Sequence, residues 1–202
     1  MSSGVIAVIR TGVTEYALTL GRGFSETDVD AIEITMTVPN AIEVIERLIG
    51  EGVKRVGGGT VRTVEQVRNL AKIGASFVVA PNLDEKIVKE SVNLGIPVTP
   101  GTLTPSEMVQ ALQWGATSEK IFPISAVGGL SFVKSVLEPL PDLSLVISGG
   151  VQTREVNSYL ELGCVGVCLG GALWRMDDAA SGDPKKVRAY TERALALVAK
   201  GK

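Results

Sequence analysis

Histidine is absent from all 202 residues of the sequence. This absence excludes Ser-His-Asp triads, zinc sites built on histidine and imidazole general bases. Any proton transfer must therefore use a carboxylate, a lysine, a tyrosine or water. The available chemistry is narrow before any motif is considered.

Cysteine is scarce. Cys164 and Cys168, the two that are present, lie four residues apart in the apolar run Cys164-Val165-Gly166-Val167-Cys168. On an extended strand this spacing separates them by roughly 13 Å, which is too far for a disulfide or a shared metal ion. We therefore expect two free thiols that are buried as apolar side chains.

Long apolar runs and blocks of positive charge are also missing. No apolar run approaches the roughly 20 residues that cross a bilayer. A net charge of −2 without a basic run argues against nucleic acid or a membrane surface as partner. Segment 1–4 shows no secretory signal. With 45% hydrophobic content, the chain is expected to form one globular domain, 1–202, that is soluble and cytoplasmic.

One pattern repeats along the chain: a short β-branched run ends in Gly, Pro or Thr, and an amphipathic helical stretch follows. This alternation predicts parallel strands joined by crossover helices. Asp183-Pro184 predicts the start of a last helix that ends near Ala199. The expected strands are Val5–Arg10, Ala31–Met36, Arg55–Thr60, Phe77–Pro81, Pro97–Gly101, Lys120–Ile124, Leu145–Gly149 and Val165–Gly170. The other expected helices include Ala41–Ile49, Val64–Ile73, Asp84–Leu94, Pro105–Gln113, Leu130–Leu137 and Arg154–Leu162.

Eight such units of about 25 residues predict an α/β fold of the (β/α)8 TIM-barrel type. The competing architecture is an open doubly wound sheet, which uses fewer strands and usually a glycine-rich first turn. The turn after the first expected strand contains only Gly12, which favours the barrel. In such barrels the reacting groups lie at the carboxyl ends of the strands.

A lysine stands inside an apolar strand, in the segment Glu119-Lys120-Ile121-Phe122-Pro123-Ile124. Alternation places Lys120, Phe122 and Ile124 on one face. If this face is the inner one, the amine is desolvated, and a neutral amine in a dry pocket can attack a carbonyl to form an imine. The alternative is a strand-end lysine whose ammonium reaches solvent.

A glutamate occupies a comparable position in the second expected strand. Alternation places Glu33, Thr35 and Thr37 on one face, and the polar face should point into the barrel because the apolar face meets the helices. A buried carboxylate must be paired, protonated or functional. One reading is an ion pair with Lys120 or Arg10. The other is a proton shuttle beside an imine-forming lysine.

Arg10 and several glycine-rich strand ends complete the candidates. The Arg10 guanidinium either grips a substrate carboxylate through two parallel hydrogen bonds or faces solvent. Thr60, after Gly57-Gly58-Gly59, offers a hydroxyl group. Gly149-Gly150 and Gly170-Gly171 follow the last two expected strands, where many (β/α)8 enzymes bind phosphate. Tight turns alone would also explain the glycines.

Taken together, these segments resemble the class I aldolases that cleave 2-keto-3-deoxy-6-phosphogluconate, its galactonate counterpart or 4-hydroxy-2-oxoglutarate. The resemblance covers nearly the whole chain. The segments that carry it are Ile32-Glu33-Ile34-Thr35, Gly58-Gly59-Thr60-Val61, Ala80-Pro81-Asn82, Thr99-Pro100-Gly101-Thr102, Lys120-Ile121-Phe122-Pro123, Gly149-Gly150-Val151 and Leu169-Gly170-Gly171.

The resemblance implies that Lys120 forms a Schiff base and that Glu33 is the general acid and base. It also implies a homotrimer that acts on a small molecule. No metal or other cofactor is expected, because the iminium supplies the electrophilic activation. The implied substrate-binding residues are Arg10, Thr37, Thr60, Pro81, Thr102 and Phe122. The implied phosphate-binding residues are Ser148, Gly149, Gly150, Gly170 and Gly171.

The sequence departs from the family pattern at two positions. Thr37 stands where phosphogluconate-type members usually carry an arginine for the pyruvate carboxylate. Galactonate-type members resemble this chain more closely there and also end the first strand in arginine, so Arg10 is expected to take the carboxylate role. Ala172 replaces a serine that often follows the second glycine pair, which removes one hydroxyl donor for phosphate.

The expected reaction is the cleavage of 2-keto-3-deoxy-6-phosphogluconate to pyruvate and glyceraldehyde 3-phosphate. The galactonate epimer and 4-hydroxy-2-oxoglutarate are alternative substrates. A catalytically silent barrel that only binds a sugar phosphate is the alternative from a different class of protein.

Overall fold

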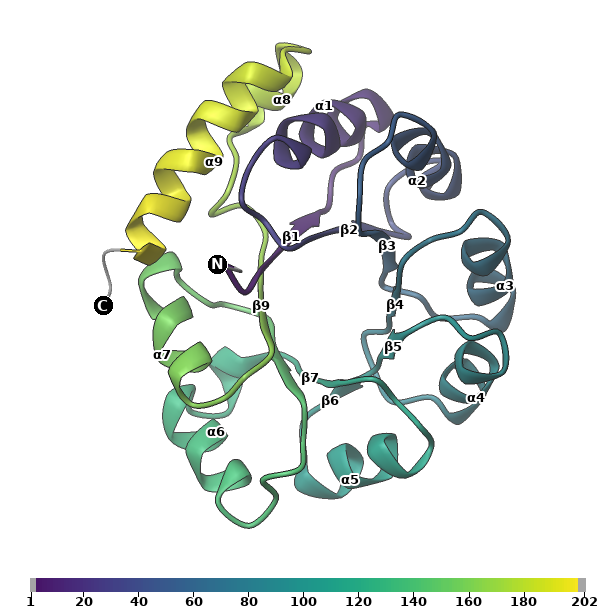
Figure 1. Cartoon of the computed structure of the whole chain (residues 1–202), viewed down its shortest axis with the longest axis vertical. Helices are drawn as coiled ribbons and strands as arrows, with labels where there is room; N and C mark the ends of the chain where they lie inside the picture. The colour runs from purple at the N-terminus through teal and green to yellow at the C-terminus, as the bar shows by residue number, and fades with distance from the viewer. Residues whose placement is uncertain (1–2, 200–202) are drawn as a thin grey trace.

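The structure is a computed structural model that describes residues 3–199. It shows a ring of parallel strands surrounded by helices, and Figure 1 views this ring along its axis. The expected TIM-barrel architecture is confirmed. The strands are β1 Val5–Ile9, β2 Ala31–Thr35, β3 Val56–Gly59, β4 Val78–Val79, β5 Val98–Thr99, β6 Gly101–Thr102, β7 Glu119–Ile121, β8 Leu145–Ile147 and β9 Gly166–Leu169.

The strands follow the hydrogen-bonded order β5-β4-β3-β2-β1-β9-β8-β7-β6. β5 and β6 stand at the two ends of this order, yet they are consecutive in the chain and only Pro100 separates them. They are the two halves of one strand, interrupted where proline has no N–H for the ladder. The two ends of the sheet therefore meet within one strand, which corresponds to the expected strand Pro97–Gly101, and the sheet forms a closed ring.

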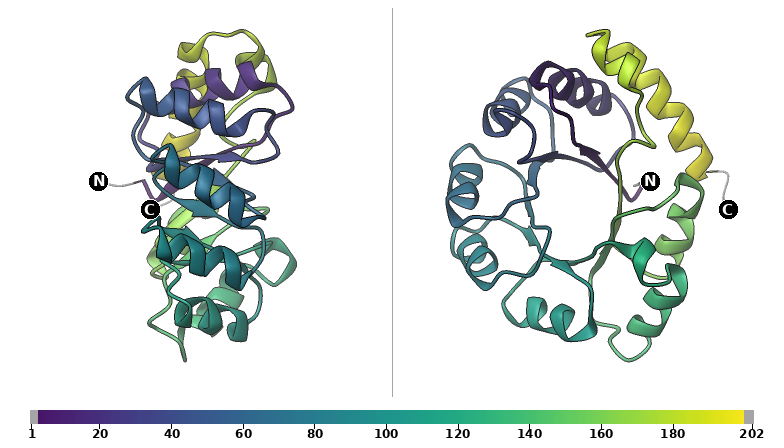
Figure 2. Two further views of the ribbon diagram at one scale, coloured as in Figure 1. Left: turned by 90° about the vertical axis from the view of Figure 1, so that its right-hand side faces the viewer. Right: turned by 180° about the vertical axis from the view of Figure 1, so that it is seen from behind.

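Helices cover the outside of the ring, as Figures 1 and 2 show. α9 packs against both α1 and α7 and closes the outer layer where the chain ends. The Asp183 carboxylate accepts a hydrogen bond from Lys185 N at 3.0 Å, so the expected cap of the last helix is present. The helices are α1 Thr14–Ser25, α2 Ala41–Gly50, α3 Val64–Lys72, α4 Glu85–Asn93, α5 Pro105–Gln113, α6 Leu130–Leu137, α7 Val156–Glu161, α8 Met176–Ala180 and α9 Pro184–Ala199, with 3₁₀ helices η1 Ile124–Ala126 and η2 Thr153–Glu155.

Helix α1 is not among the expected helices given above, and it contains Gly21 and Gly23, which lower helix propensity. The structure explains both glycines. A Cβ on Gly21 would lie 2.5 Å from Leu48 of α2, and a Cβ on Gly23 would lie 2.6 Å from Val187 of α9. Both distances are too short for van der Waals contact. The glycines allow α1 to pack closely against its two neighbours.

The expected strand Lys120–Ile124 needs correction. β7 spans Glu119–Ile121, and Ile124 begins η1 instead. The ladder ends here because Pro123 has no backbone N–H to continue it. Ile124 therefore does not share the strand face of Lys120, whereas the Phe122 ring, which follows the strand directly, lies on the same side as the Lys120 amine.

Glu119 is a fully buried carboxyl group next to Lys120 in the sequence. Strand alternation turns it to the face opposite Lys120. Its Oε2 accepts a hydrogen bond from Ser144 N at 3.0 Å, whereas its Oε1 has no hydrogen-bond partner. Burial, with a smaller contribution from the charge of Asp142, raises the pKa of Glu119 to about 7.

We expect Glu119→Gln to stabilise the protein at pH 8 and to have little effect at pH 5. The folded protein holds this proton more tightly than the unfolded chain, so the free energy of unfolding decreases as pH rises from about 4.5 to about 7. The difference amounts to about 3 kcal/mol above pH 7. Urea denaturation at both pH values measures it, with the exposed Glu161→Gln as control. Equal pH dependence in Glu119→Gln and the wild type would contradict this prediction.

Candidate active site

Lys120 lies inside the barrel wall, on β7. Only 6% of its surface is exposed, and in the ladder it stands opposite Gly101 of β6. The ammonium nitrogen lies 5.1 Å from the centre of the Phe122 ring. The ring itself is 38% exposed. The Lys120 amine is therefore buried beside Phe122, as expected. It does not reach solvent, which was the alternative.

Glu33 lies in the middle of β2 and is 4% exposed. Burial raises the pKa of its carboxyl group, while the positive charges of Lys120 and then of Arg10 oppose that rise. The three residues, distant in the sequence, thus share one electrostatic environment. Within residues 3–199 Glu33 makes no direct ion pair with either cation. The ion pair of Glu33 with Lys120 or Arg10, one of the two interpretations of the sequence, is therefore not formed in this structure.

Gly59 provides the space that Glu33 occupies. The ladder sets β3 beside β2, with Glu33 opposite Gly57 and Thr35 opposite Gly59. A Cβ on Gly59 would lie 1.8 Å from Glu33 Oε1, well inside van der Waals contact. In contrast, a Cβ on Gly58 would meet Leu70 of α3. Two adjacent glycines thus have different functions, one in the site and one in helix packing.

Gly59→Ala should displace the Glu33 carboxylate and lower kcat/KM about 100-fold for any reaction in which Glu33 transfers a proton, because a misplacement of about 1 Å at a reacting group has this effect. Steady-state kinetics measures the loss, and circular dichroism verifies the fold. Gly50→Ala is the matched control, since a Cβ on Gly50 meets no atom within 4 Å. Wild-type kinetics in Gly59→Ala would show that this space is not required.

Arg10 and Thr60 are brought together across β2. Arg10 follows β1 and Thr60 follows β3, and these strands flank β2 in the sheet. Arg10 Nη2 donates a hydrogen bond to Thr60 Oγ1 at 3.2 Å. Thr60 has a backbone φ of 56°, in the left-handed region. Arg10 is exposed, and this hydrogen bond holds its guanidinium against Thr60.

Two linked hydroxyl groups, those of Thr35 and Thr37, determine whether Thr37 donates or accepts a hydrogen bond. Thr35 Oγ1 donates to the carbonyl oxygen of Ile9 at 3.2 Å and lies 2.8 Å from Thr37 Oγ1. Because the single Thr35 proton is already used, Thr37 must donate to Thr35. Thr37 is exposed and presents only lone pairs to a ligand. It cannot replace an arginine as a donor to a carboxylate.

Two other expected substrate contacts, Thr102 and Pro81, have structural partners. Thr102 Oγ1 is buried and donates to the backbone oxygen of Lys120 at 3.3 Å. The Pro81 carbonyl lies so close to Gly101 that a Cβ there would be 2.3 Å from the Pro81 oxygen. The structure thus places Thr102 as a support for the Lys120 backbone, a position that the sequence did not indicate.

The two glycine pairs present unused backbone donors. Gly149 and Gly150 have φ values of 89° and 86°, which glycine adopts readily. Gly170 and Gly171 have open space around their Cα atoms, with nothing nearer than 3.8 Å to an added Cβ. Within the described residues, the N–H groups of Gly149, Gly150, Gly171 and Ala172 donate to no protein acceptor. Such amides at strand ends can bind an anion.

Cys168 belongs to the same interior. It lies on β9, and burial raises the pKa of its thiol to about 12, with a smaller rise from the charge of Glu33. Ser148, an expected phosphate ligand, lies near Cys168 and slightly opposes the rise in the pKa of its thiol. Cys164 is also buried, and both thiols are free, as expected. The sequence did not indicate that Cys168 lies near the charged pair.

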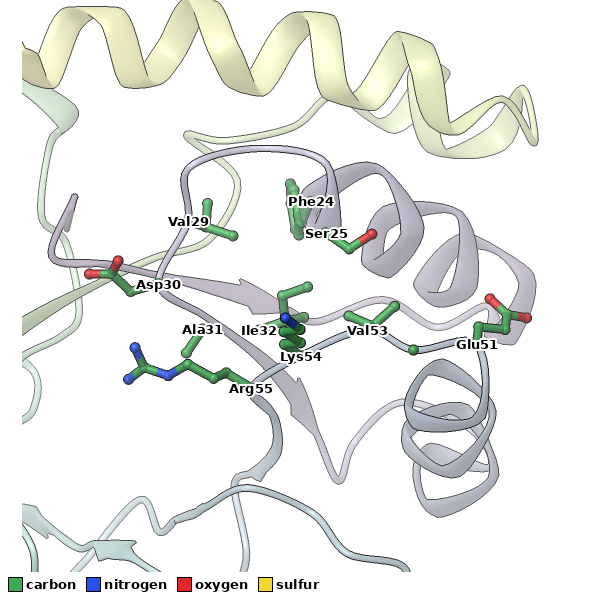
Figure 3. A pocket seen from close by; sticks show the side chains of 11 residues that line it. Phe24, Ser25, Val29, Asp30, Ala31, Ile32, Glu51, Val53, Lys54 and Arg55 are labelled. Atoms are coloured by element: carbon green, nitrogen blue, oxygen red, sulfur yellow. The ribbon is translucent and has the colours of Figure 1, made fainter. Parts of the chain in front are cut away.

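A separate pocket lies at the opposite end of the barrel, where β2 and β3 begin (Figure 3). Its volume is about 500 Å³. None of the expected site residues lines it. The lining residues are Phe24, Ser25, Val29, Asp30, Ala31, Ile32, Glu51, Gly52, Val53, Lys54 and Arg55.

Residues 3–199 contain neither a cluster of metal ligands nor a helix that could span a membrane. No three His, Cys, Asp or Glu side chains in this range come close enough together to hold a metal ion. No helix in the same range is both long enough and apolar enough to span a bilayer.

Comparison with known proteins identifies relatives along nearly the whole chain. The sequence model of the family described as "KDPG and KHG aldolase" matches residues 1–190. The 2-dehydro-3-deoxy-6-phosphogalactonate aldolase of Escherichia coli (strain K12) is 31% identical over 191 residues, 93% of each chain. The 2-dehydro-3-deoxy-phosphogluconate aldolase of Dickeya dadantii is also 31% identical, over 95% of this chain and 91% of the relative.

Solved structures show the same similarity. A structure described as native KDPGal is 30% identical, covers 98% of this chain and 93% of its own, and superimposes with a TM-score of 0.79. The KDPG aldolase of Legionella pneumophila, with pyruvate captured as a covalent carbinolamine intermediate, is 26% identical. Its match covers 96% of this chain and 94% of its own, with a TM-score of 0.84.

Proposed function

Because the chain belongs to the KDPG and KHG aldolase family, and is therefore an aldolase and a lyase, we propose that it cleaves 2-keto-3-deoxy-6-phosphogluconate to pyruvate and glyceraldehyde 3-phosphate. The observation that carries this proposal is the enclosure of Lys120 in the barrel, in one electrostatic environment with the buried Glu33. A shielded amine and a carboxyl group that exchanges protons are the two groups that Schiff-base chemistry needs.

The reaction begins when the neutral amine of Lys120 attacks the C2 ketone. Glu33 protonates the departing hydroxyl of the carbinolamine, and water leaves as the iminium forms. Glu33 then accepts the proton of the C4 hydroxyl, directly or through a water molecule, while the C3–C4 bond breaks and its electrons enter the iminium. The aldehyde leaves, and the remaining enamine is protonated at C3 and hydrolysed to pyruvate. The raised pKa of Glu33 suits a group that must both give and take a proton.

The substrate anions are assigned to two groups of donors. Arg10 binds the C1 carboxylate, and Thr60 contributes its hydroxyl proton, because its oxygen already accepts from Arg10. Thr37 lies nearby as an acceptor and contacts the substrate through a hydroxyl group instead. Phe122 covers one side of the imine. The unused amides after β8 and β9 bind the 6-phosphate, with Ala172 supplying only its backbone donor.

Borohydride trapping tests this function. Incubation with pyruvate and borohydride should leave a covalent adduct on Lys120, which peptide mass spectrometry locates. Recovery of unmodified protein would refute the Schiff-base mechanism. If phosphate or a sugar phosphate raised the melting temperature while no adduct formed, a silent binding barrel would be the better description.

The galactonate epimer is a second candidate substrate, favoured by the Arg10–Thr60 contact and by Thr37 in place of an arginine. The similarity to the galactonate aldolase of Escherichia coli agrees with it. Values of kcat/KM for both epimers, with and without the 6-phosphate, distinguish the candidates. A preference for 4-hydroxy-2-oxoglutarate over every phosphorylated substrate would refute the phosphate assignment.

A homotrimer in the cytoplasm is proposed from the resemblance to the family. Sedimentation equilibrium tests the assembly, since a trimer has three times the 21.2 kDa of one chain. A monomer at micromolar concentration would contradict it.

A further inference from the structure

Thr60 adopts a backbone conformation that its side chain disfavours. Its φ is 56°, and among the described residues other than glycine only Asn40 and Arg55 share a positive φ. Asparagine tolerates this region, whereas a β-branched residue there is a genuine outlier. Such conformations persist where the surrounding structure demands them, and they concentrate at functional sites.

The conformation of Thr60 coincides with one specific contact. Its Oγ1 accepts the hydrogen bond from Arg10 Nη2 at 3.2 Å. Arg10 and Thr60 follow the two strands on either side of β2, so this hydrogen bond bridges the strand of Glu33. The positive charge of Arg10 opposes the rise that burial causes in the pKa of Glu33.

We propose that Thr60 is a positioning residue, which accepts a strained backbone in order to hold the Arg10 guanidinium at the end of the barrel where the strands beside β2 end. This inference rests on the proposed aldolase function. It assigns Thr60 two effects besides its own contact with substrate: it orients the donor of the pyruvate carboxylate, and it keeps a positive charge beside the general acid and base. A flexible arginine at a strand end would do neither reliably.

Three substitutions separate these effects. Thr60→Val retains the branched shape but removes the acceptor, Thr60→Ser retains the acceptor, and Thr60→Gly relieves the backbone while it removes the side chain. Arg55→Gly is the matched control, because Arg55 has a φ of 54° and lies at the opposite end of the barrel.

The first readout is the pyruvate concentration that gives half-maximal borohydride trapping on Lys120. Thr60→Val and Thr60→Gly should raise it about tenfold, as expected for the loss of an oriented charged hydrogen bond. Thr60→Ser should restore it to within about threefold of the wild-type value. Arg55→Gly should leave it unchanged.

The second readout is the pH dependence of kcat/KM, which reports ionisation of the free enzyme. Arg10 lowers the pKa of Glu33, so releasing the guanidinium should let that pKa rise. The apparent pKa that Glu33 contributes to the pH profile of kcat/KM should therefore be higher in Thr60→Val than in the wild type. In Thr60→Ser it should equal the wild-type value. A role limited to packing would reduce activity without changing this apparent pKa.

The third readout is thermal stability. Thr60→Gly and Arg55→Gly should both melt at or above the wild-type temperature, because glycine accepts a positive φ without strain. Only Thr60→Gly should lose pyruvate affinity.

Two outcomes would overturn the inference: an unchanged pyruvate requirement and apparent pKa in Thr60→Val, or a failure of Thr60→Ser to restore them. Absence of trapping in the wild-type protein would instead refute the proposed function itself. Because the wild type is trapped in parallel with every variant, the two failures are distinguishable.

Discussion

Lys120→Met is expected to lower kcat/KM for aldol cleavage by at least about 10³-fold and to abolish trapping by pyruvate and borohydride. Methionine has nearly the length of lysine and suits a side chain that is 6% exposed, so the fold should persist. What is lost is the nucleophile, and the histidine-free chain offers no imidazole to replace it.

Lys134→Met is the control for this change. Lys134 is exposed on α6, and its replacement should leave both activity and trapping at wild-type levels. An adduct that persists in Lys120→Met, or moves to another lysine with full activity, would refute the assignment of the nucleophile.

Glu33→Gln should lower kcat by about 10²- to 10³-fold, which is the usual contribution of a general acid or base. Glutamine preserves the shape but cannot transfer a proton. The pyruvate adduct should still form on Lys120, only more slowly, because the amine remains. Stopped-flow measurements of imine formation separate this defect from the loss of the nucleophile.

The same variant should change how stability depends on pH. Burial raises the pKa of Glu33, so the folded protein holds its proton more tightly than the unfolded chain does. The free energy of unfolding of the wild type therefore falls as pH rises above the ordinary glutamate range, and this part of the decline should vanish in Glu33→Gln. Unchanged kcat in Glu33→Gln, with full activity in the surface variant Glu161→Gln, would exclude Glu33 as the proton shuttle.

The sequence by itself predicted the barrel and singled out Lys120 and Glu33, two ionisable residues that the barrel buries. Strand alternation has a period of two residues and needs no tertiary information, so it placed Glu33 on the inner face. A lysine in an apolar run was recognisable for the same reason. That strand ends earlier than alternation alone predicts, because Pro123 has no N–H to donate to the ladder.

Only the tertiary structure decided how the groups around this pair are arranged. The Arg10–Thr60 hydrogen bond joins residues 50 positions apart that follow two strands which are not neighbours, and it depends on the curvature of the ring. The space that Gly59 leaves for Glu33 depends on register, and the polarity of Thr37 depends on which acceptor Thr35 finds. Local patterns specify which face a side chain occupies, whereas contacts between strands follow from closure of the sheet.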